Sequence, residues 1–185
     1  MPDEFPRNSL QYDEYSLRVL SEREINTLSS FDCRDDDLND FFRNECIAHR
    51  KELMAETYVF TESNKSIALI SFCNDSIELS KSVRKHILPF PMRHYTAIPA
   101  VKIVRLGVFS EHQRRGIGSL LLDFCKVLFV TDNRTGCRVI TVDAYNNDHA
   151  IHFYRNQGFA FLSEEDAERD TRIMWCDLLN RMVVH

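Results

Sequence analysis

The most informative stretch of the sequence is a short loop with two glycines, which follows an apolar segment and precedes a segment of helical periodicity. The loop is Gln113-Arg114-Arg115-Gly116-Ile117-Gly118, and Ser119 follows it. The first N–H groups of a helix have no intrahelical partner and lie at the positive end of the helix dipole, so they stabilise a phosphate. Glycine lets the backbone approach such a ligand closely. The pattern therefore indicates phosphate binding, although a glycine pair also suits a plain tight turn.

A second run of interest lies further along the chain, between Val142 and Phe159. It contains Asn147, then the aromatic pair Phe153-Tyr154. A tyrosine hydroxyl can serve as a general acid, but a tyrosine on an apolar helix face is also an ordinary core residue. An asparagine before a helix is a favoured N-cap. The residues alone leave these alternatives open.

Together the two runs resemble, in order and separation, the two signatures of the GNAT (Gcn5-related N-acetyltransferase) superfamily. The first resembles the Gln/Arg-x-x-Gly-x-Gly/Ala motif by which GNAT enzymes hold the pyrophosphate of acyl-CoA. The second resembles the family's Asn-x-x-Ala-x-x-Phe/Leu-Tyr motif, which is followed by Gly-Phe. The resemblance implies that acetyl-CoA is bound by Leu106, Gly107, Val108, Gln113, Arg114, Arg115, Gly116, Ile117, Gly118, Ser119 and Asn147.

The resemblance also implies a mechanism. A primary amine of the acceptor would attack the thioester of acetyl-CoA directly, while an amide of the strand ending at Leu106-Gly107-Val108 polarises the thioester carbonyl. Tyr154 stands at the position of the general acid that protonates the leaving thiolate. The general base is left open among Asp143, Glu78, His94 and a chain of waters.

The identity of the acceptor has three alternatives. Phe31-Asp32-Cys33 and Leu38-Asn39 resemble the toxin-like GNAT branch that acetylates aminoacyl-tRNA, except that Arg34 stands where that branch usually has glycine. The net charge of −5 argues against a nucleic acid, because Lys and Arg supply most contacts to phosphates, although residues 81–115 are locally basic. We therefore expect a small-molecule or protein amine, with aminoacyl-tRNA as the alternative and a non-catalytic CoA-binding module as the third possibility.

Composition sets the remaining expectations. A length of 185 residues with 44% hydrophobic residues fits a single domain, 1–185, with an acyl-CoA-binding core over residues 101–159. Six scattered cysteines without a CxxC pair indicate reduced thiols in the cytoplasm. Cys46-x-x-His49 and His149-x-x-His152 each offer two metal ligands where structural zinc needs four, so no metal is expected. No apolar run is long enough for a membrane span, and we expect a monomer or homodimer.

The secondary structure around these motifs is predicted from the spacing of the apolar residues and from the prolines and turn-forming residues between them. We expect a GNAT-like α/β (α+β) fold, with a mixed, mostly antiparallel sheet of six to seven strands and helices on both faces. Residues 1–12 are predicted to be a polar lead, and residues 88–99 an irregular connection because of their prolines. Strands are predicted over 14–20, 57–61, 67–72, 101–109, 139–144, 158–162 and 171–178. Helices are predicted over 35–52, 80–87, 116–130 and 147–157.

Overall fold

The computed structural model describes residues 9–21, 24, 28–89, 92–133 and 136–179. The chain divides into two compact units, residues 1–73 with 103–132 and residues 74–102 with 133–185. The prediction of a single domain therefore stays a prediction.

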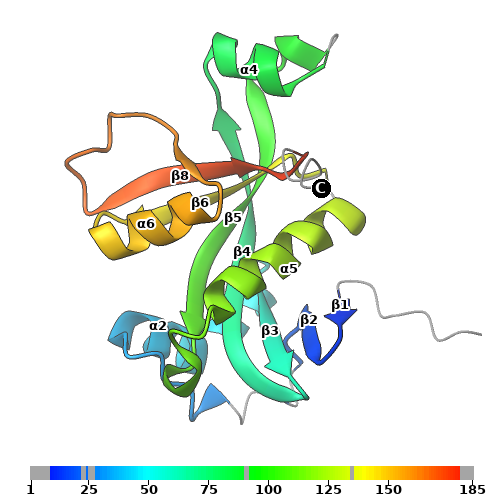
Figure 1. Cartoon of the computed structure of the whole chain (residues 1–185), viewed down its shortest axis with the longest axis vertical. Helices are drawn as coiled ribbons and strands as arrows, with labels where there is room; N and C mark the ends of the chain where they lie inside the picture. The colour runs from blue at the N-terminus through cyan, green and yellow to red at the C-terminus, as the bar shows by residue number, and fades with distance from the viewer. Residues whose placement is uncertain (1–8, 22–23, 25–27, 90–91, 134–135, 180–185) are drawn as a thin grey trace, which may run out of the picture. The chain divides into compact units, whose positions relative to one another are not determined.

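Eight strands are found among the described residues, hydrogen-bonded in the order β1-β2-β3-β4-β5-β6-β8-β7 (Figure 1). They are β1 (Ser9–Tyr12), β2 (Tyr15–Val19), β3 (Glu56–Glu62), β4 (Lys65–Glu78), β5 (Ala97–Val108), β6 (Val139–Tyr145), β7 (Ala160–Phe161) and β8 (Thr171–Asp177). The helices are α2 (Asp36–Asp40), α3 (Cys46–Lys51), α4 (Lys81–Ile87), α5 (Ile117–Thr131) and α6 (Asp148–Asn156). The predicted α/β class with a mostly antiparallel sheet is confirmed, but the sheet has eight strands where six to seven were expected, because β1 was not predicted.

Two predictions about irregular segments were wrong. The polar lead contains β1, which pairs with β2 across a turn where Asp13 has a φ of 51°. The connection over residues 88–99 ends early, because β5 begins at Ala97 and includes Pro99. The proline has no N–H, but its carbonyl still accepts a hydrogen bond from Arg138 N at 2.8 Å, so a strand can continue through it.

In the first unit, helices pack on both faces of the sheet. Successive residues of a strand point to opposite faces. On β3, Phe60 contacts Phe124 of α5, with ring centroids 5.0 Å apart, whereas Val59 belongs to a buried cluster with Phe41 and Phe42. Helix α5 therefore covers one face of β3, and the α2–α3 segment covers the other (Figure 1).

The helix predicted over residues 35–52 is present but is not a regular α-helix throughout. Asp35 caps α2 by accepting a hydrogen bond from Leu38 N at 3.0 Å. A π-helical turn, η2 (Phe41–Glu45), then connects α2 to α3. Both Phe41 and Phe42 are buried there, so the apolar residues that predicted a helix do supply its core contacts.

In the second unit, β6 pairs antiparallel with β8 from Val139↔Asp177 to Tyr145↔Thr171. Arg138 fastens the end of this pair, because its Nε and Nη2 donate to the two carboxylate oxygens of Asp177 at 2.8 and 2.9 Å. Helix α4 begins after Ser80, whose side chain accepts a hydrogen bond from Val83 N. Among the described residues, no helix combines the length and the apolar character that a membrane crossing requires.

Candidate active site

The phosphate-binding candidate lies in the first unit, at the start of α5. Gly116 precedes the helix in the left-handed conformation, with a φ of 79°, and its carbonyl accepts from Leu120 N at 3.0 Å. The amides of Ile117, Gly118 and Ser119 come before that helical hydrogen bond, so they are the amides that a helix start leaves without an i−4 partner. The helix thus begins where the sequence predicts it, and phosphate binding by these amides stays a prediction.

Gln113 braces this loop through its side chain. Its Nε2 donates to Cys33 O at 2.8 Å and to Val108 O at 3.1 Å. A backbone hydrogen bond holds the segment before the loop, since Ser110 N donates to Asp32 O at 2.8 Å. The amide group of Gln113 therefore has a structural role, and its contact with acetyl-CoA stays a prediction.

The two arginines of the loop differ in their surroundings. Arg115 Nη1 lies 2.9 Å from His112 Nδ1, and its Nη2 lies 3.5 Å from Glu62 Oε1. Arg114 is exposed with a φ of 61°, and its side chain has no hydrogen bond or ion pair with the residues that the structure describes. Neither Glu62 nor His112 was predicted from the sequence. For Glu62 no local pattern could have revealed the contact, since 53 positions separate it from Arg115.

The strand segment before the loop has a clear packing constraint. A Cβ added to Gly107 would lie 2.8 Å from Phe31 Cζ and 3.3 Å from Phe42 Cε2. A glycine is therefore needed there so that the fully buried Phe31 can pack against the strand. Leu106 and Val108 beside it are half-buried, and the prediction that this segment contacts acetyl-CoA remains untested.

The second motif lies in the second unit. Asn147 is the N-cap of α6, because its Oδ1 accepts a hydrogen bond from Ala150 N at 2.9 Å. This is one of the two roles expected for Asn147, and the other, a contact with the cofactor, stays a prediction. Tyr154 is buried on α6, with its ring centroid 5.0 Å from that of Phe153 and 5.3 Å from that of Phe159.

Burial raises the pKa of Tyr154 above the ordinary value for tyrosine. A phenol with a raised pKa stays protonated near neutrality, as a general acid must be before it donates its proton. The aromatic contacts equally fit a core residue, so the catalytic role of Tyr154 stays a prediction.

The candidates for the general base have different surroundings, and the structure singles out none of them. Asp143 forms an ion pair with Lys102, with 2.5 Å between Oδ2 and Nζ. Glu78 is exposed, and the ring of His94 stacks on that of Tyr95 with centroids 4.5 Å apart.

The cysteine and histidine pairs considered as metal ligands make local contacts. Cys46 Sγ donates to Phe42 O, and His152 Nε2 lies 2.9 Å from Asn156 Nδ2. Within the described ranges, no group of three or more His, Cys, Asp or Glu residues is placed to hold a metal ion.

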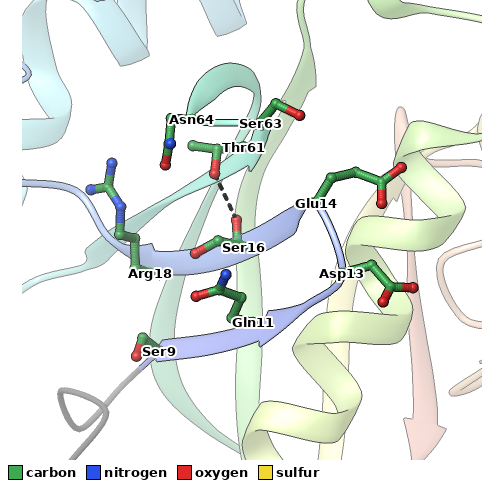
Figure 2. Close-up of a pocket in the computed structure, with 9 residues that line it drawn as sticks. All are labelled: Ser9, Gln11, Asp13, Glu14, Ser16, Arg18, Thr61, Ser63 and Asn64. Atoms are coloured by element: carbon green, nitrogen blue, oxygen red, sulfur yellow. Dashed lines mark hydrogen bonds between the residues drawn. The ribbon is translucent and has the colours of Figure 1, made fainter. Parts of the chain in front are cut away.

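A separate polar groove of about 420 Å³ lies over β1–β3 in the first unit (Figure 2). It is lined by Ser9, Gln11, Asp13, Glu14, Ser16, Arg18, Thr61, Ser63 and Asn64. Arg18 is neutralised by Glu24, whose carboxylate oxygens lie 2.6 and 2.5 Å from its two Nη atoms. The groove contains none of the residues that the motifs predict for acetyl-CoA.

Known structures share this fold over most of their length. A tyrosine-to-phenylalanine mutant of KacT matches with a TM-score of 0.70 and 17% identity, over 91% of this chain and 97% of that one. AtaT complexed with acetyl-methionyl-tRNAfMet matches with a TM-score of 0.72 and 21% identity, over 91% and 98% of the two chains. AtaTR bound with AcCoA matches with a TM-score of 0.71 and 20% identity, over 93% and 98%.

Sequence comparison gives a shorter but closer match. N-alpha-acetyltransferase 60 from Danio rerio is 43% identical over 58 residues, which are 31% of this chain and 24% of that protein. The match thus spans about a quarter of the relative's length. Residues 55–160 match the acetyltransferase (GNAT) domain, and this range contains both motifs. Because that match covers more than half of the chain, the protein belongs to the GNAT acetyltransferase family.

Proposed function

We propose that the protein is an acetyl-CoA-dependent N-acetyltransferase that transfers the acetyl group to a primary amine. The observation that carries this proposal is the start of α5, where Gly116 in the left-handed conformation leaves three amides before the first helical hydrogen bond, next to Arg114 and Arg115. Two arginines add positive charge to a site that already favours phosphate. The pyrophosphate of acetyl-CoA is the ligand that the GNAT family brings to this loop.

The reaction needs few groups from the protein. The acceptor nitrogen attacks the thioester carbonyl, a C–N bond forms, and the C–S bond then breaks. The proton of the Tyr154 hydroxyl passes to the departing sulfur, while the extra proton of the nitrogen goes to a base. A backbone amide of the segment Leu106–Val108 would stabilise the charge that develops on the carbonyl oxygen.

A pair of matched glycine variants tests the phosphate site. Gly116 and Gly136 have φ values of 79° and 78°, and a Cβ added to either meets nothing within 4 Å. Gly116→Ala and Gly136→Ala therefore impose the same backbone strain at two different places. Isothermal titration with acetyl-CoA should show weaker binding for Gly116→Ala alone. Equal affinity of the two variants would contradict the assignment of the site.

The acceptor we propose first is a small-molecule or protein amine. Two basic residues that suggested a polyanion already have acidic partners: Lys102 pairs with Asp143, and Arg105 with Asp37. This pairing reduces the charge that residues 81–115 could offer to a nucleic acid.

A second candidate acceptor is aminoacyl-tRNA. In the N-terminal motif, Asn39 Oδ1 accepts from Cys33 N at 2.8 Å, and Asn39 Nδ2 donates to Asp32 Oδ1 at 3.0 Å. Arg34 has a φ of 64°, a conformation that glycine adopts without strain, so the backbone here suits the glycine of the toxin-like branch. AtaT, which shares the fold, was solved with acetyl-methionyl-tRNAfMet.

Salt dependence separates the two acceptors. Acetylation of charged tRNA should lose kcat/KM steeply between low and physiological salt, because counterions released from phosphates drive such binding. Acetylation of a peptide or polyamine should fall much less. Growth arrest on expression would also favour the tRNA acceptor. We also propose a cytoplasmic location, with which the six free thiols agree. The proposed oligomeric state is a monomer or a homodimer.

A further inference from the structure

Arg115 of the phosphate loop is connected to the sheet through one acidic side chain, Glu62, and one aromatic side chain, Tyr15. Its Nη2 lies 3.5 Å from Glu62 Oε1 at the end of β3, and the same oxygen accepts a hydrogen bond from the Tyr15 hydroxyl at 2.9 Å. The Tyr15 ring stacks on Phe60 with centroids 5.6 Å apart and meets Phe124 of α5 edge-on. The pKa of Tyr15 is raised, first because its hydroxyl is bonded to Glu62. Glu62 is thus anchored by a packed aromatic ring.

His112 holds Arg115 from the other side. Its Nδ1 lies 2.9 Å from Arg115 Nη1, and its Nε2 lies 3.1 Å from Glu111 Oε1. Arg115 can only donate and a carboxylate can only accept, so a neutral His112 with its proton on Nε2 satisfies both contacts. The side chain of His112 is only 15% exposed, whereas that of Glu111 is 77% exposed. The histidine is therefore the fixed member of this pair.

These contacts restrict a long side chain that would otherwise be mobile. The Arg115 side chain is 50% exposed, and an exposed arginine loses rotamer freedom whenever it is fixed on a ligand. Two of its terminal N–H groups point at Glu62 and His112, and a guanidinium has five in all. The remaining N–H groups are available to a phosphate.

We propose that Glu62 is a positioning residue, which together with His112 presets Arg115 for contact with a phosphate of CoA. The inference rests on the proposed function, since it requires that the loop binds acetyl-CoA. Glu62 could have the opposite effect, by repelling the phosphate or by retaining Arg115. Its contact with Arg115 occupies one N–H of the guanidinium, so the contact is kept when the other N–H groups bind a phosphate. The Glu62 side chain is 24% exposed, so water and salt screen its repulsion of the phosphate. A charge-assisted bond between arginine and phosphate is stronger and would dominate.

The test compares two substitutions that remove the same charge at different places. Glu62→Gln replaces the charged acceptor of Arg115 with a neutral amide oxygen, which holds a guanidinium less strongly. Glu14→Gln removes an exposed carboxylate that lines the separate groove in Figure 2. Titration calorimetry with CoA should show that Glu62→Gln weakens binding about two- to fivefold, the range of an exposed ion pair. Glu14→Gln should bind as tightly as wild type or slightly more tightly, because it lowers the negative field near an anion. Tighter binding by Glu62→Gln would overturn the proposal.

Further measurements distinguish a loss of Arg115 positioning from a general loss of folding. Glu62→Gln combined with Arg115→Gln should bind no more weakly than Arg115→Gln alone, because the two residues act through one contact. In kinetics, Glu62→Gln should raise the KM for acetyl-CoA and leave kcat unchanged, which damage to the fold would not do selectively. Tyr15→Phe keeps the packed ring and removes only its hydroxyl, so it should cause a smaller loss in the same direction. Additive losses, or a fall in kcat alone, would contradict the role.

Two shorter ligands identify the phosphate. With 3′-dephospho-CoA, an unchanged loss in Glu62→Gln assigns the contact to the pyrophosphate, and an abolished loss assigns it to the 3′-phosphate. Pantetheine, which has neither phosphate, should bind wild type and variant equally, and a loss with this ligand would refute positioning. If wild type fails to bind CoA, the proposed function falls. If wild type binds and Glu62→Gln binds equally well, only the positioning role falls.

Discussion

The two family motifs are used very differently by the fold. At the start of α5, backbone amides precede the first helical hydrogen bond and Arg114 extends into solvent. At the start of α6, the side-chain oxygen of Asn147 caps the helix, and the ring of Tyr154 packs against the rings of Phe153 and Phe159. The first motif thus leaves three backbone amides ahead of the first helical hydrogen bond, whereas in the second motif the side chain of Asn147 bonds to the helix and the ring of Tyr154 packs against its neighbours. The structure therefore supports a functional role more strongly for the first motif than for the second, although both match the family.

The largest expected effect is a loss of turnover on substitution in α6, which would show that the second motif also takes part in the chemistry. Tyr154→Phe keeps the ring contacts but removes the hydroxyl, so kcat should fall by about 10²-fold or more, the usual contribution of a general acid. Acetyl-CoA affinity should stay near that of wild type. Tyr145→Phe is the control, since this exposed tyrosine lies in the same unit and precedes Asn147, where the motif begins. Unchanged kcat in Tyr154→Phe would make the residue part of the core only.

The next effect concerns the strand that leads into the phosphate loop. Gly107→Ala places a Cβ 2.8 Å from Phe31, a side chain with no exposed surface, so the ring or the strand must shift. We expect a loss of about 1–3 kcal/mol in the free energy of unfolding, as for other overpacked cores. Urea denaturation measures it. Wild-type stability in this variant would mean that the Phe31 ring has room to move.

A smaller effect sharpens the assignment of Asn147. Asn147→Ala removes the cap of α6 and should lower the free energy of unfolding by about 1 kcal/mol. Asn147→Ser keeps a cap oxygen and should restore most of that loss. If serine restores stability but acetyl-CoA binding remains weak, then the amide group of Asn147 also contacts the cofactor and the contrast between the motifs is less complete.

The smallest effect lies in the N-terminal motif. Arg34 has a positive φ of 64°, and its only hydrogen bond with the residues that the structure describes is from its backbone N to Asp32 Oδ1. Arg34→Gly should therefore raise the free energy of unfolding by about 0.5–1 kcal/mol, because glycine adopts this conformation without the clash that a Cβ creates. Thermal denaturation would detect the gain, and a lower melting temperature would contradict it.

The local parts of the fold could be predicted from the sequence. Alternation and helical spacing located β2 to β8 and the helices to within a few residues, with two exceptions. Strand β4 continues to Glu78, beyond the strand predicted over 67–72, and β5 begins at Ala97, within the segment predicted to be irregular. The strand β1 was missed because its exposed residues resemble a polar tail. The π-helical turn at Phe41–Glu45 was missed as well, since the burial pattern of a helix does not depend on a single widened turn.

The site was predictable where it depends on neighbours in the chain. Gly116 and the start of α5 follow from local spacing, but the contacts that hold the loop do not. Gln113 bonds to Cys33 across 80 positions, and Arg115 meets Glu62 across 53. Such partners are determined by tertiary packing, which a single sequence does not specify.

The most direct test of the account is acetyl-CoA turnover by the wild-type protein, followed as free thiol, against polyamines, amino acids, peptides and charged tRNA. An N-acetyltransferase should release free thiol and form an acetylated amine with at least one of these acceptors. Tight binding of acetyl-CoA without release for any acceptor would contradict it, and would leave a CoA-binding module in place of an enzyme.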